Sequence, residues 1–157
     1  MDNPVTTFVK DNKATIICPA CNKAKTVQVA SFRQKRHHIR VRCACGEIFT
    51  VLLDFRSHYR KSVNLSGTYE IKHQREKAKG AIHITNISLS GIRFTVSGLN
   101  LLQPGYLVSL DFQLDDRKQS CIRRLAIVRS VHGNRVGCEF IREEGQQDRD
   151  LAFYLRC

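Results

Sequence analysis

Short alternating segments fill the last two thirds of the chain. Apolar and polar residues follow one another with a period of two, which is typical of half-buried β-strands. Turn-forming dipeptides such as Ser90-Gly91 and Pro104-Gly105 separate these segments. We therefore expect an all-β domain, built as a small antiparallel barrel or sandwich. The predicted strands are residues 63–72, 81–87, 92–96, 106–114, 121–131 and 135–141.

A helical period occurs near the end of the sequence, in residues 146–155. Leu151 and Leu155 stand one helical turn apart, and Arg156 follows them, which suits the negative end of a helix dipole. We expect a short C-terminal helix that packs on the barrel.

The first third of the chain predicts a separate small β module. Residues 1–13 are mostly polar and are interpreted as a loose tail. Residues 26–32 and 38–42 alternate, and residues 47–53 are rich in strand formers. The basic run 33–36 lies between the two alternating segments and is predicted to form the tip of a hairpin.

Two cysteine pairs flank these strands. Cys18 and Cys21 have the Cys-x-x-Cys spacing, whereas Cys43 and Cys45 are one residue closer together than in the common zinc knuckle. Four thiolates from two tight turns can form the tetrahedron that zinc prefers. A module of about 40 residues has too small a core to be stable alone, so a bound metal would explain its folding. The pattern predicts a zinc ribbon with a closed, structural site.

Other interpretations of the cysteines stay open. The metal could have been lost, Cys18 and Cys21 could form a redox pair, and His37 or His38 could replace a missing ligand.

Composition adds a preference for anionic partners. The net charge is +12, and each side of a division after Leu53 carries +6 (9 − 3 before it, 17 − 11 after it). This balance favours an anionic partner, which could be a nucleic acid, a nucleotide, an acidic protein or a membrane surface. No apolar run reaches about 18 residues, so no membrane insertion is expected. The polar N-terminus lacks the layout of a signal peptide, and we expect a cytoplasmic protein with reduced thiols.

A basic run at residues 55–61 follows the predicted module directly. It holds Arg56 and Arg60, and the apolar residues around them have no helical period. We interpret this run as the hinge between a module at 14–53 and a domain at 54–157, and as half of an anion-binding site. Arginine suits such a site because its planar guanidinium can hold phosphates or a guanine edge.

A second motif lies between two predicted strands. Asn86 and Ser88 are short polar residues on one side of an extended chain, and they alternate with Ile87 and Leu89, which we expect to point into the core. Gly91 permits a turn or a close approach of a ligand. By itself, this motif favours a plain hairpin turn whose side chains only satisfy local backbone groups.

Arg-x-x-x-Arg at 56 and 60, Asn-x-Ser-x-x-Gly at 86–91 and a closing strand at 136–140 together resemble the PilZ domain family. The resemblance covers residues 54–157 and implies a six-stranded antiparallel barrel with an added C-terminal helix. It also implies binding of the bacterial second messenger cyclic di-GMP. Arg56 and Arg60 would hold its phosphates and guanine edges. Phe55 stands where many members carry a further arginine, which favours one bound ligand molecule over a stacked pair.

By resemblance, Asn86 and Ser88 would contact a guanine, and Gly91 would leave room for it. The sequence contains no phosphate loop, nucleophile elbow or His-Glu metal motif, so we expect a binding protein and not an enzyme. Cys121, Cys138 and Cys157 are expected to be ordinary core or surface thiols.

The leading hypothesis is a cyclic di-GMP receptor. Ligand binding would change the orientation of its two modules and present a new surface to a protein partner. One alternative is a zinc-ribbon nucleic-acid-binding regulator, with or without control by cyclic di-GMP. Another is a barrel that binds no ligand and only docks to a protein.

Overall fold

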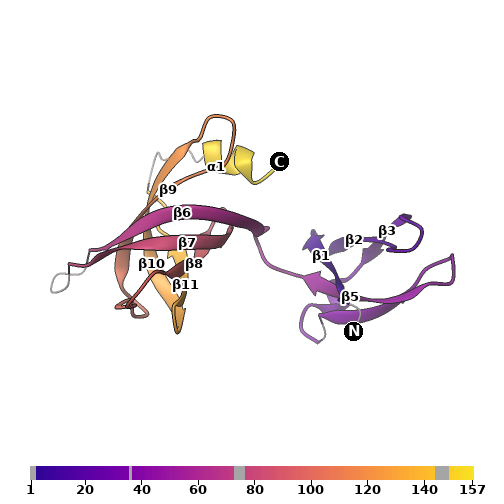
Figure 1. Ribbon diagram of the computed structural model, residues 1–157. Coiled ribbons are helices and arrows are strands. Elements are labelled where there is room, and N and C mark those ends of the chain that lie inside the picture. The colour runs from indigo at the N-terminus through magenta and orange to yellow at the C-terminus, as the bar shows by residue number, and fades with distance from the viewer. Residues whose placement is uncertain (1–2, 36, 73–76, 144–148) are drawn as a thin grey trace. The chain divides into compact units, whose positions relative to one another are not determined.

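Two compact units make up the chain, Met1–Ser57 and His58–Cys157. They are seen in a computed structural model that describes residues 3–35, 37–72, 77–143 and 149–157 (Figure 1). No helix in these ranges is long and apolar enough to cross a membrane.

The first unit is a five-stranded sheet in the order β3-β2-β1-β5-β4. β1 and β5 are parallel, and the other neighbouring strands are antiparallel. A 3₁₀ turn at Ala30–Phe32 follows the third strand. The small β module predicted from the sequence is confirmed. Its strands are β1 (Val5–Lys10), β2 (Lys13–Ile17), β3 (Ala24–Gln28), β4 (His38–Arg42) and β5 (Ile48–Asp54).

The prediction of a loose tail at residues 1–13 is wrong, because β1 lies there and is the central strand of the sheet. Thr7 and Val9 point inward and are 7% and 6% exposed. A two-residue turn at Asp11 and Asn12 leads into β2, and both residues have positive φ, 49° and 60°. Short polar residues tolerate this conformation, which two-residue hairpins require.

The predicted hairpin tip at 33–36 is also wrong. The strands on either side of it, β3 and β4, are the two outer strands of the sheet and do not pair. The segment is therefore a connection across the sheet, anchored by Val29, which is fully buried. Residue 36 lies outside the described residues.

The second unit is a closed six-stranded barrel in the order β10-β11-β8-β7-β6-β9, with every pair antiparallel. A short helix, α1 (Arg149–Tyr154), follows it. The predicted barrel and helix are confirmed, although predicted helix residues 146–148 lie outside the described residues. The barrel strands are β6 (Lys61–Ile71), β7 (Lys79–Ile87), β8 (Gly91–Val96), β9 (Leu107–Gln113), β10 (Cys121–His132) and β11 (Arg135–Phe140).

Alternate residues of these strands fill the barrel, and the helix packs on it through Leu151 and Tyr154, which are both buried. The Tyr154 hydroxyl donates a hydrogen bond to the Asp115 carboxylate at 2.5 Å. Lys61 Nζ donates to the carbonyl oxygens of Tyr154 (3.0 Å) and Cys157 (2.9 Å) and lies 4.1 Å from the Tyr154 ring centroid. These contacts fix the start of β6, one residue after Arg60.

Candidate functional site: a cavity in the barrel wall and a four-thiol cluster

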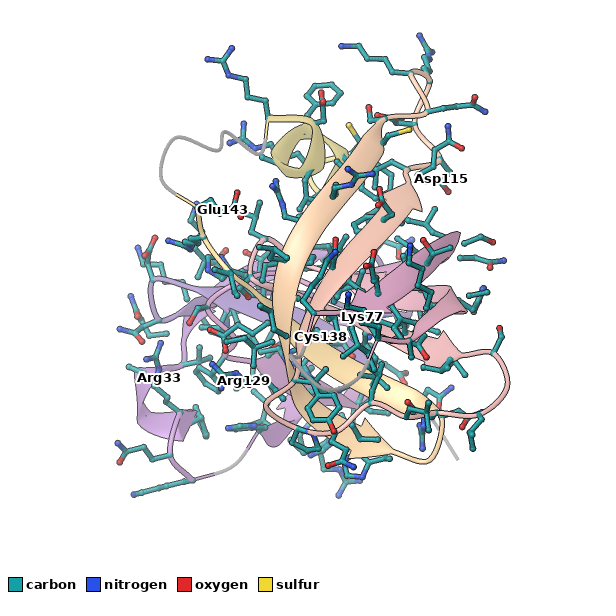
Figure 2. The ribbon with its side chains drawn as sticks, turned by 90° about the vertical axis from the view of Figure 1, so that its left-hand side faces the viewer. Arg33, Lys77, Asp115, Arg129, Cys138 and Glu143 are labelled. Atoms are coloured by element: carbon teal, nitrogen blue, oxygen red, sulfur yellow. The ribbon has the colours of Figure 1, made fainter. Side chains whose placement is uncertain are left out.

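A cavity of about 280 Å³ opens on the outer face of the barrel, at the β7–β8 turn and the neighbouring strands β11 and β10. Four of the five predicted ligand residues line it, namely Arg60, Asn86, Ser88 and Gly91. Figure 2 labels Arg129 and Cys138, which line the same cavity from β10 and β11. The structure thus brings together side chains as far apart in the sequence as Arg60 and Glu139, which are separated by 79 positions (139 − 60).

Two β-bulges shape the cavity walls. The β7–β8 register shifts between Ile84 and Asn86, and the β10–β11 register shifts between Val128 and Ser130. Each bulge inserts one extra residue, Arg129 in the second case, and a bulge re-aims the side chains around it. Arg129 and Asn86 therefore owe their positions to local irregularities that alternation in the sequence does not predict.

Ser88 organises the turn between β7 and β8. It is 3% exposed. Its hydroxyl oxygen accepts hydrogen bonds from the backbone N–H groups of Ser90 (3.3 Å) and Gly91 (3.2 Å), and the hydroxyl lies 3.3 Å from the Gly91 carbonyl oxygen. The turn interpretation of this motif therefore describes Ser88 well, and a contact between Ser88 and a guanine stays a prediction.

The expectation that Ile87 and Leu89 both point into the core is half wrong. Ile87 is fully buried, but Leu89 is 38% exposed. β7 ends at Ile87, so the alternation of buried and exposed residues stops there. Ser88 is therefore buried in place of Leu89.

Gly91 and Gly137 both line the cavity, and we call these two residues the glycine floor. A Cβ atom on Gly91 would lie 2.4 Å from the Cys138 carbonyl oxygen, which gives this glycine a packing reason of its own. A Cβ on Gly137 would lie 2.6 Å from Ser130 Oγ. In the β8–β11 register, Gly91 is opposite Glu139 and Gly137 is opposite Arg93. The two charged side chains are therefore diagonal neighbours beside the two glycines.

Three arginines and one glutamate give the cavity its charge. Arg60, Arg93 and Arg129 line it together with Glu139. Arg129 Nε donates to Glu139 Oε2 at 2.8 Å, and the two side chains are 59% and 57% exposed. The sequence reasoning missed Arg93, Arg129 and Glu139. Its only signal was the closing strand at 136–140, whose register against β8 is needed to place them.

Arg56 is not among the described residues that line the cavity. It lies in the first unit, where its N–H donates to Asp54 Oδ1 at 3.1 Å and its Nη1 lies 3.5 Å from Asp54 Oδ2. Its side chain is 54% exposed. Residues 55–60, between β5 and β6, form no helix or strand, as predicted. The predicted contact between Arg56 and the ligand phosphates stays a prediction.

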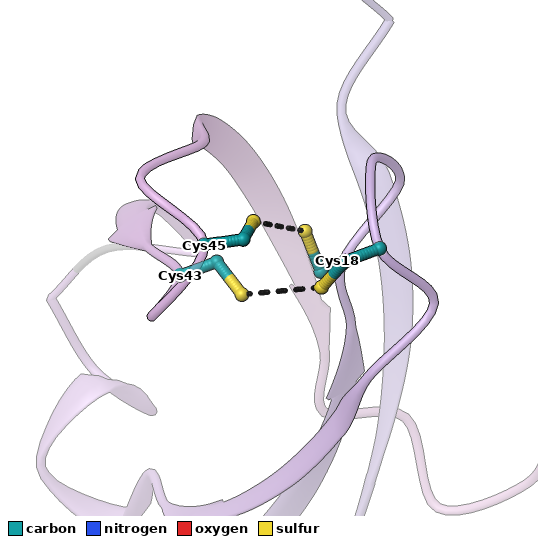
Figure 3. A group of neighbouring side chains, drawn as sticks. Cys18, Cys43 and Cys45 are labelled. Atoms are coloured by element: carbon teal, nitrogen blue, oxygen red, sulfur yellow. Dashed lines mark hydrogen bonds between the residues drawn. The ribbon is translucent and has the colours of Figure 1, made fainter.

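The predicted metal ligands form a cluster in the first unit. Cys18 and Cys21 lie in the β2–β3 turn, and Cys43 and Cys45 lie in the β4–β5 turn. Their four Sγ atoms all lie within 4.8 Å of one another, with 3.7 Å between Cys18 and Cys45 and 3.6 Å between Cys21 and Cys43 (Figure 3).

These distances suit a metal better than a disulfide. Four sulfur atoms at about 2.3 Å from a zinc ion are about 3.8 Å apart, whereas a disulfide requires about 2.0 Å. The positive φ of Asn22 (57°) and Gly46 (97°) allows both turns to bend around a common centre. His37 Nε2 instead lies 3.3 Å from the Arg33 carbonyl oxygen, and its ring packs on Phe55 with 5.3 Å between centroids. The cluster can hold a metal ion.

The pKa values of the cluster thiols also favour a bound metal ion. Hydrogen bonds from the backbone and side chain of Cys45 lower the pKa of Cys43 to about 7. The backbone N–H of Glu47 favours the Cys45 thiolate, but the Cys43 side chain and burial outweigh it and raise the pKa of Cys45 to about 11. Ionisation of one thiol therefore disfavours ionisation of its neighbour, and a divalent cation would relieve the repulsion between the two thiolates.

Comparison with known proteins identifies the family. The chain matches the PilZ domain over residues 54–156. The structure resembles the Bacillus subtilis inhibitor of motility MotI/DgrA, with a TM-score of 0.52 and 17% identity over 74% of this chain. It also resembles YcgR from Escherichia coli, solved in complex with c-di-GMP, with a TM-score of 0.52 and 11% identity over 94% of this chain.

These similarities cover 61% of the length of each of the two neighbours. No curated protein matches the sequence. At this identity the neighbours show the fold, and the family match to 103 of the 157 residues (54–156) shows the membership that the motifs predicted. The chain belongs to the PilZ domain family.

Proposed function

We propose that the protein is a receptor for cyclic di-GMP and that the barrel binds this nucleotide in the cavity around Arg60 and Asn86. The observation that carries the proposal is the meeting of Arg60, Asn86 and the β7–β8 turn at one cavity of a PilZ barrel. The solved complex of YcgR with c-di-GMP supports it by analogy. The activity proposed is binding and not catalysis, as the family suggests.

The chemistry of the cavity suits this ligand. Cyclic di-GMP carries two phosphate charges, and arginine binds phosphate or the guanine O6/N7 edge with a planar fork of donors. Arg60 is exposed at the rim, and the Asn86 amide offers both a donor and an acceptor to a base. Ser88 holds the turn that keeps Gly91 and its neighbours in place.

A second part of the proposal concerns Arg56. Binding would draw its guanidinium from Asp54 to the ligand, and the short connection at 55–60 would transmit this change to the first unit. An exposed pair like Arg56–Asp54 is worth at most about 1 kcal/mol, so a phosphate can compete for it. The resulting change in the orientation of the units would be the signal to a protein partner, with a coupling free energy of about 1–3 kcal/mol.

Calorimetric titration of cyclic di-GMP into single variants tests the binding proposal. A charged hydrogen bond contributes about 1.5–3 kcal/mol, so Arg60→Ala and Arg56→Ala should each weaken binding by about 10- to 150-fold. Arg123→Ala is the matched control, because Arg123 also lies on the barrel but pairs with Asp111 at 2.9 Å outside the cavity. Unchanged affinity in both the Arg60 and Arg56 variants would contradict the proposal.

Small-angle X-ray scattering with and without ligand tests the reorientation. The wild type should show a ligand-dependent change in its scattering profile, and Arg56→Ala should lose that change. Asp54→Asn removes the competing carboxylate and should strengthen binding by a factor of a few, since the pair it breaks is exposed. A scattering profile that ligand leaves unaltered would refute the switch while leaving the binding proposal intact.

We further propose that the cluster binds zinc. Four thiolates leave no open position for a substrate, so the ion would stabilise the fold and take no part in chemistry.

One observation favours a second function, nucleic-acid binding by the first unit. Along the outer strand β4, His38, Arg40 and Arg42 are exposed, while Ile39 and Val41 pack against the core. A basic stripe of this kind can contact phosphates. Salt-dependent retention on DNA tests this function. The function is supported if retention survives Arg60→Ala but is lost after neutralising Arg33, Lys35 and Arg36 or the β4 arginines. Retention that follows Arg60 would exclude it.

A further inference from the structure

An ion pair stands at the edge of the glycine floor. Glu139 faces Gly91 across the β8–β11 ladder, and Arg129 is the extra residue of the β10 bulge beside it. Their contact is made through one atom of each group, Arg129 Nε and Glu139 Oε2, at 2.8 Å. The pair therefore holds a donor group and an acceptor group side by side at the cavity wall.

Folding stability gives little reason for this pair. Both side chains are more than half exposed, at 59% and 57%, and exposed ion pairs contribute little to stability. A carboxylate also repels the phosphates of an anionic ligand, so its place in the cavity needs another explanation. The hydrogen-bonding pattern of a base supplies one.

Guanine presents a characteristic row of groups on one edge. The O6 acceptor is followed by the N1–H and 2-amino donors, and adenine has the reverse order of a 6-amino donor followed by the N1 acceptor. A guanidinium donor beside a carboxylate acceptor matches guanine in a single orientation. The carboxylate can accept from N1–H and from the 2-amino group with its two oxygens.

The neighbouring glycines Gly91 and Gly137 line the cavity and carry no side chain. The Cys138 carbonyl oxygen and Ser130 Oγ lie where their Cβ atoms would be, so at these two positions the cavity is lined by backbone. Arg93 stands opposite Gly137 on the other diagonal and can support the base or a phosphate. A base in the cavity beside these glycines would therefore meet Glu139 at one of its edges.

We infer that the Arg129–Glu139 pair reads guanine in this cavity, with Glu139 accepting from the base's N1–H and 2-amino groups and Arg129 donating to O6. The inference rests on the proposed cyclic di-GMP receptor and adds two residues that determine its specificity. Neither belongs to the Arg-x-x-x-Arg or Asn-x-Ser-x-x-Gly motifs.

The test compares cyclic di-GMP with cyclic di-IMP, which lacks the 2-amino group, and with cyclic di-AMP. Wild type should bind cyclic di-GMP more tightly than either analogue. Glu139→Gln keeps the shape but offers one acceptor and a clashing donor. It should weaken cyclic di-GMP binding by about 5- to 150-fold, which is the usual discrimination of a bidentate base contact. It should also largely remove the preference over cyclic di-IMP. Asp111→Asn alters the matched pair with Arg123 at 2.9 Å, outside the cavity, and should change neither value.

The outcomes separate the inference from the proposal beneath it. The inference alone is overturned by either of two results for the Glu139→Gln variant. In one it binds cyclic di-GMP at least as tightly as wild type, and in the other it keeps the full preference over cyclic di-IMP. Wild-type protein that binds none of the three nucleotides overturns the receptor proposal, and the inference with it. Because Glu139 is exposed, the variant should melt within a degree or two of wild type, so a loss of binding cannot be assigned to unfolding.

Discussion

Removing the zinc ion that we propose in the four-cysteine cluster is expected to unfold the first unit and leave the barrel folded. The described core of the first unit has only six buried apolar residues, whereas that of the barrel has 22. Two of the five strands of the first unit are outer strands with one partner each. The cluster joins its two hairpins, β2–β3 and β4–β5, at their turns.

The magnitude follows from the four thiols. A structural zinc ion contributes an apparent free energy of about 10–16 kcal/mol, whereas a whole domain is stable by about 5–15 kcal/mol. Six buried residues, one of them an alanine, cannot replace that contribution. Loss of the ion should therefore exceed the stability of the unit.

Amide hydrogen exchange with and without a zinc chelator measures the two units separately. The β5 amides of Val51 and Leu53 should lose protection on chelation, while the β9 amide of Leu110 should keep it. Cys43→Ser should reproduce the effect, and Cys121→Ser, an exposed thiol outside the cluster, should not. Protection of Val51 and Leu53 that persists after a metal assay shows complete removal would refute the reasoning.

Three further predictions concern the barrel. Gly91→Ala should lower the free energy of unfolding by about 1–3 kcal/mol in chemical denaturation, because its Cβ would lie 2.4 Å from the Cys138 carbonyl oxygen. An equally stable variant would contradict that packing. Burial raises the pKa of Tyr154, so the stability that its neutral form provides is full below about pH 10 and is lost as the pH rises above it. The free energy of unfolding should therefore fall less steeply above pH 10 in Tyr154→Phe than in wild type, and parallel curves would contradict this. In metal-loaded protein a thiol reagent should modify Cys121 and Cys157 quickly, whereas buried Cys138, whose pKa burial raises to about 12, should react slowly.

The sequence predicted the barrel well because its strands are long and alternate regularly. All six strands and the helix were expected near their observed places. The four cysteines were also predictable, since thiol ligands must come in close pairs on tight turns. In both cases a local pattern carries the whole signal.

Long-range pairing was the part that local patterns could not supply. The central strand β1 was missed because a short polar segment becomes a strand only through its partners β2 and β5. The supposed hairpin at 33–36 failed for the same reason, since the outer strands β3 and β4 never meet. Arg129 and Glu139 reach the cavity through a bulge and a register that no single segment encodes.

The central claim is that cyclic di-GMP binds over the Gly91–Gly137 floor, and a two-dimensional NMR titration tests it most directly. The backbone amides of Ser90, Gly91, Arg93 and Gly137 should shift and saturate as ligand is added to wild-type protein. They should stay largely still in Arg60→Ala at the same ligand concentration. No saturable shift in wild type, or shifts confined to amides outside the cavity such as those of Asp111 and Arg123, would contradict the account.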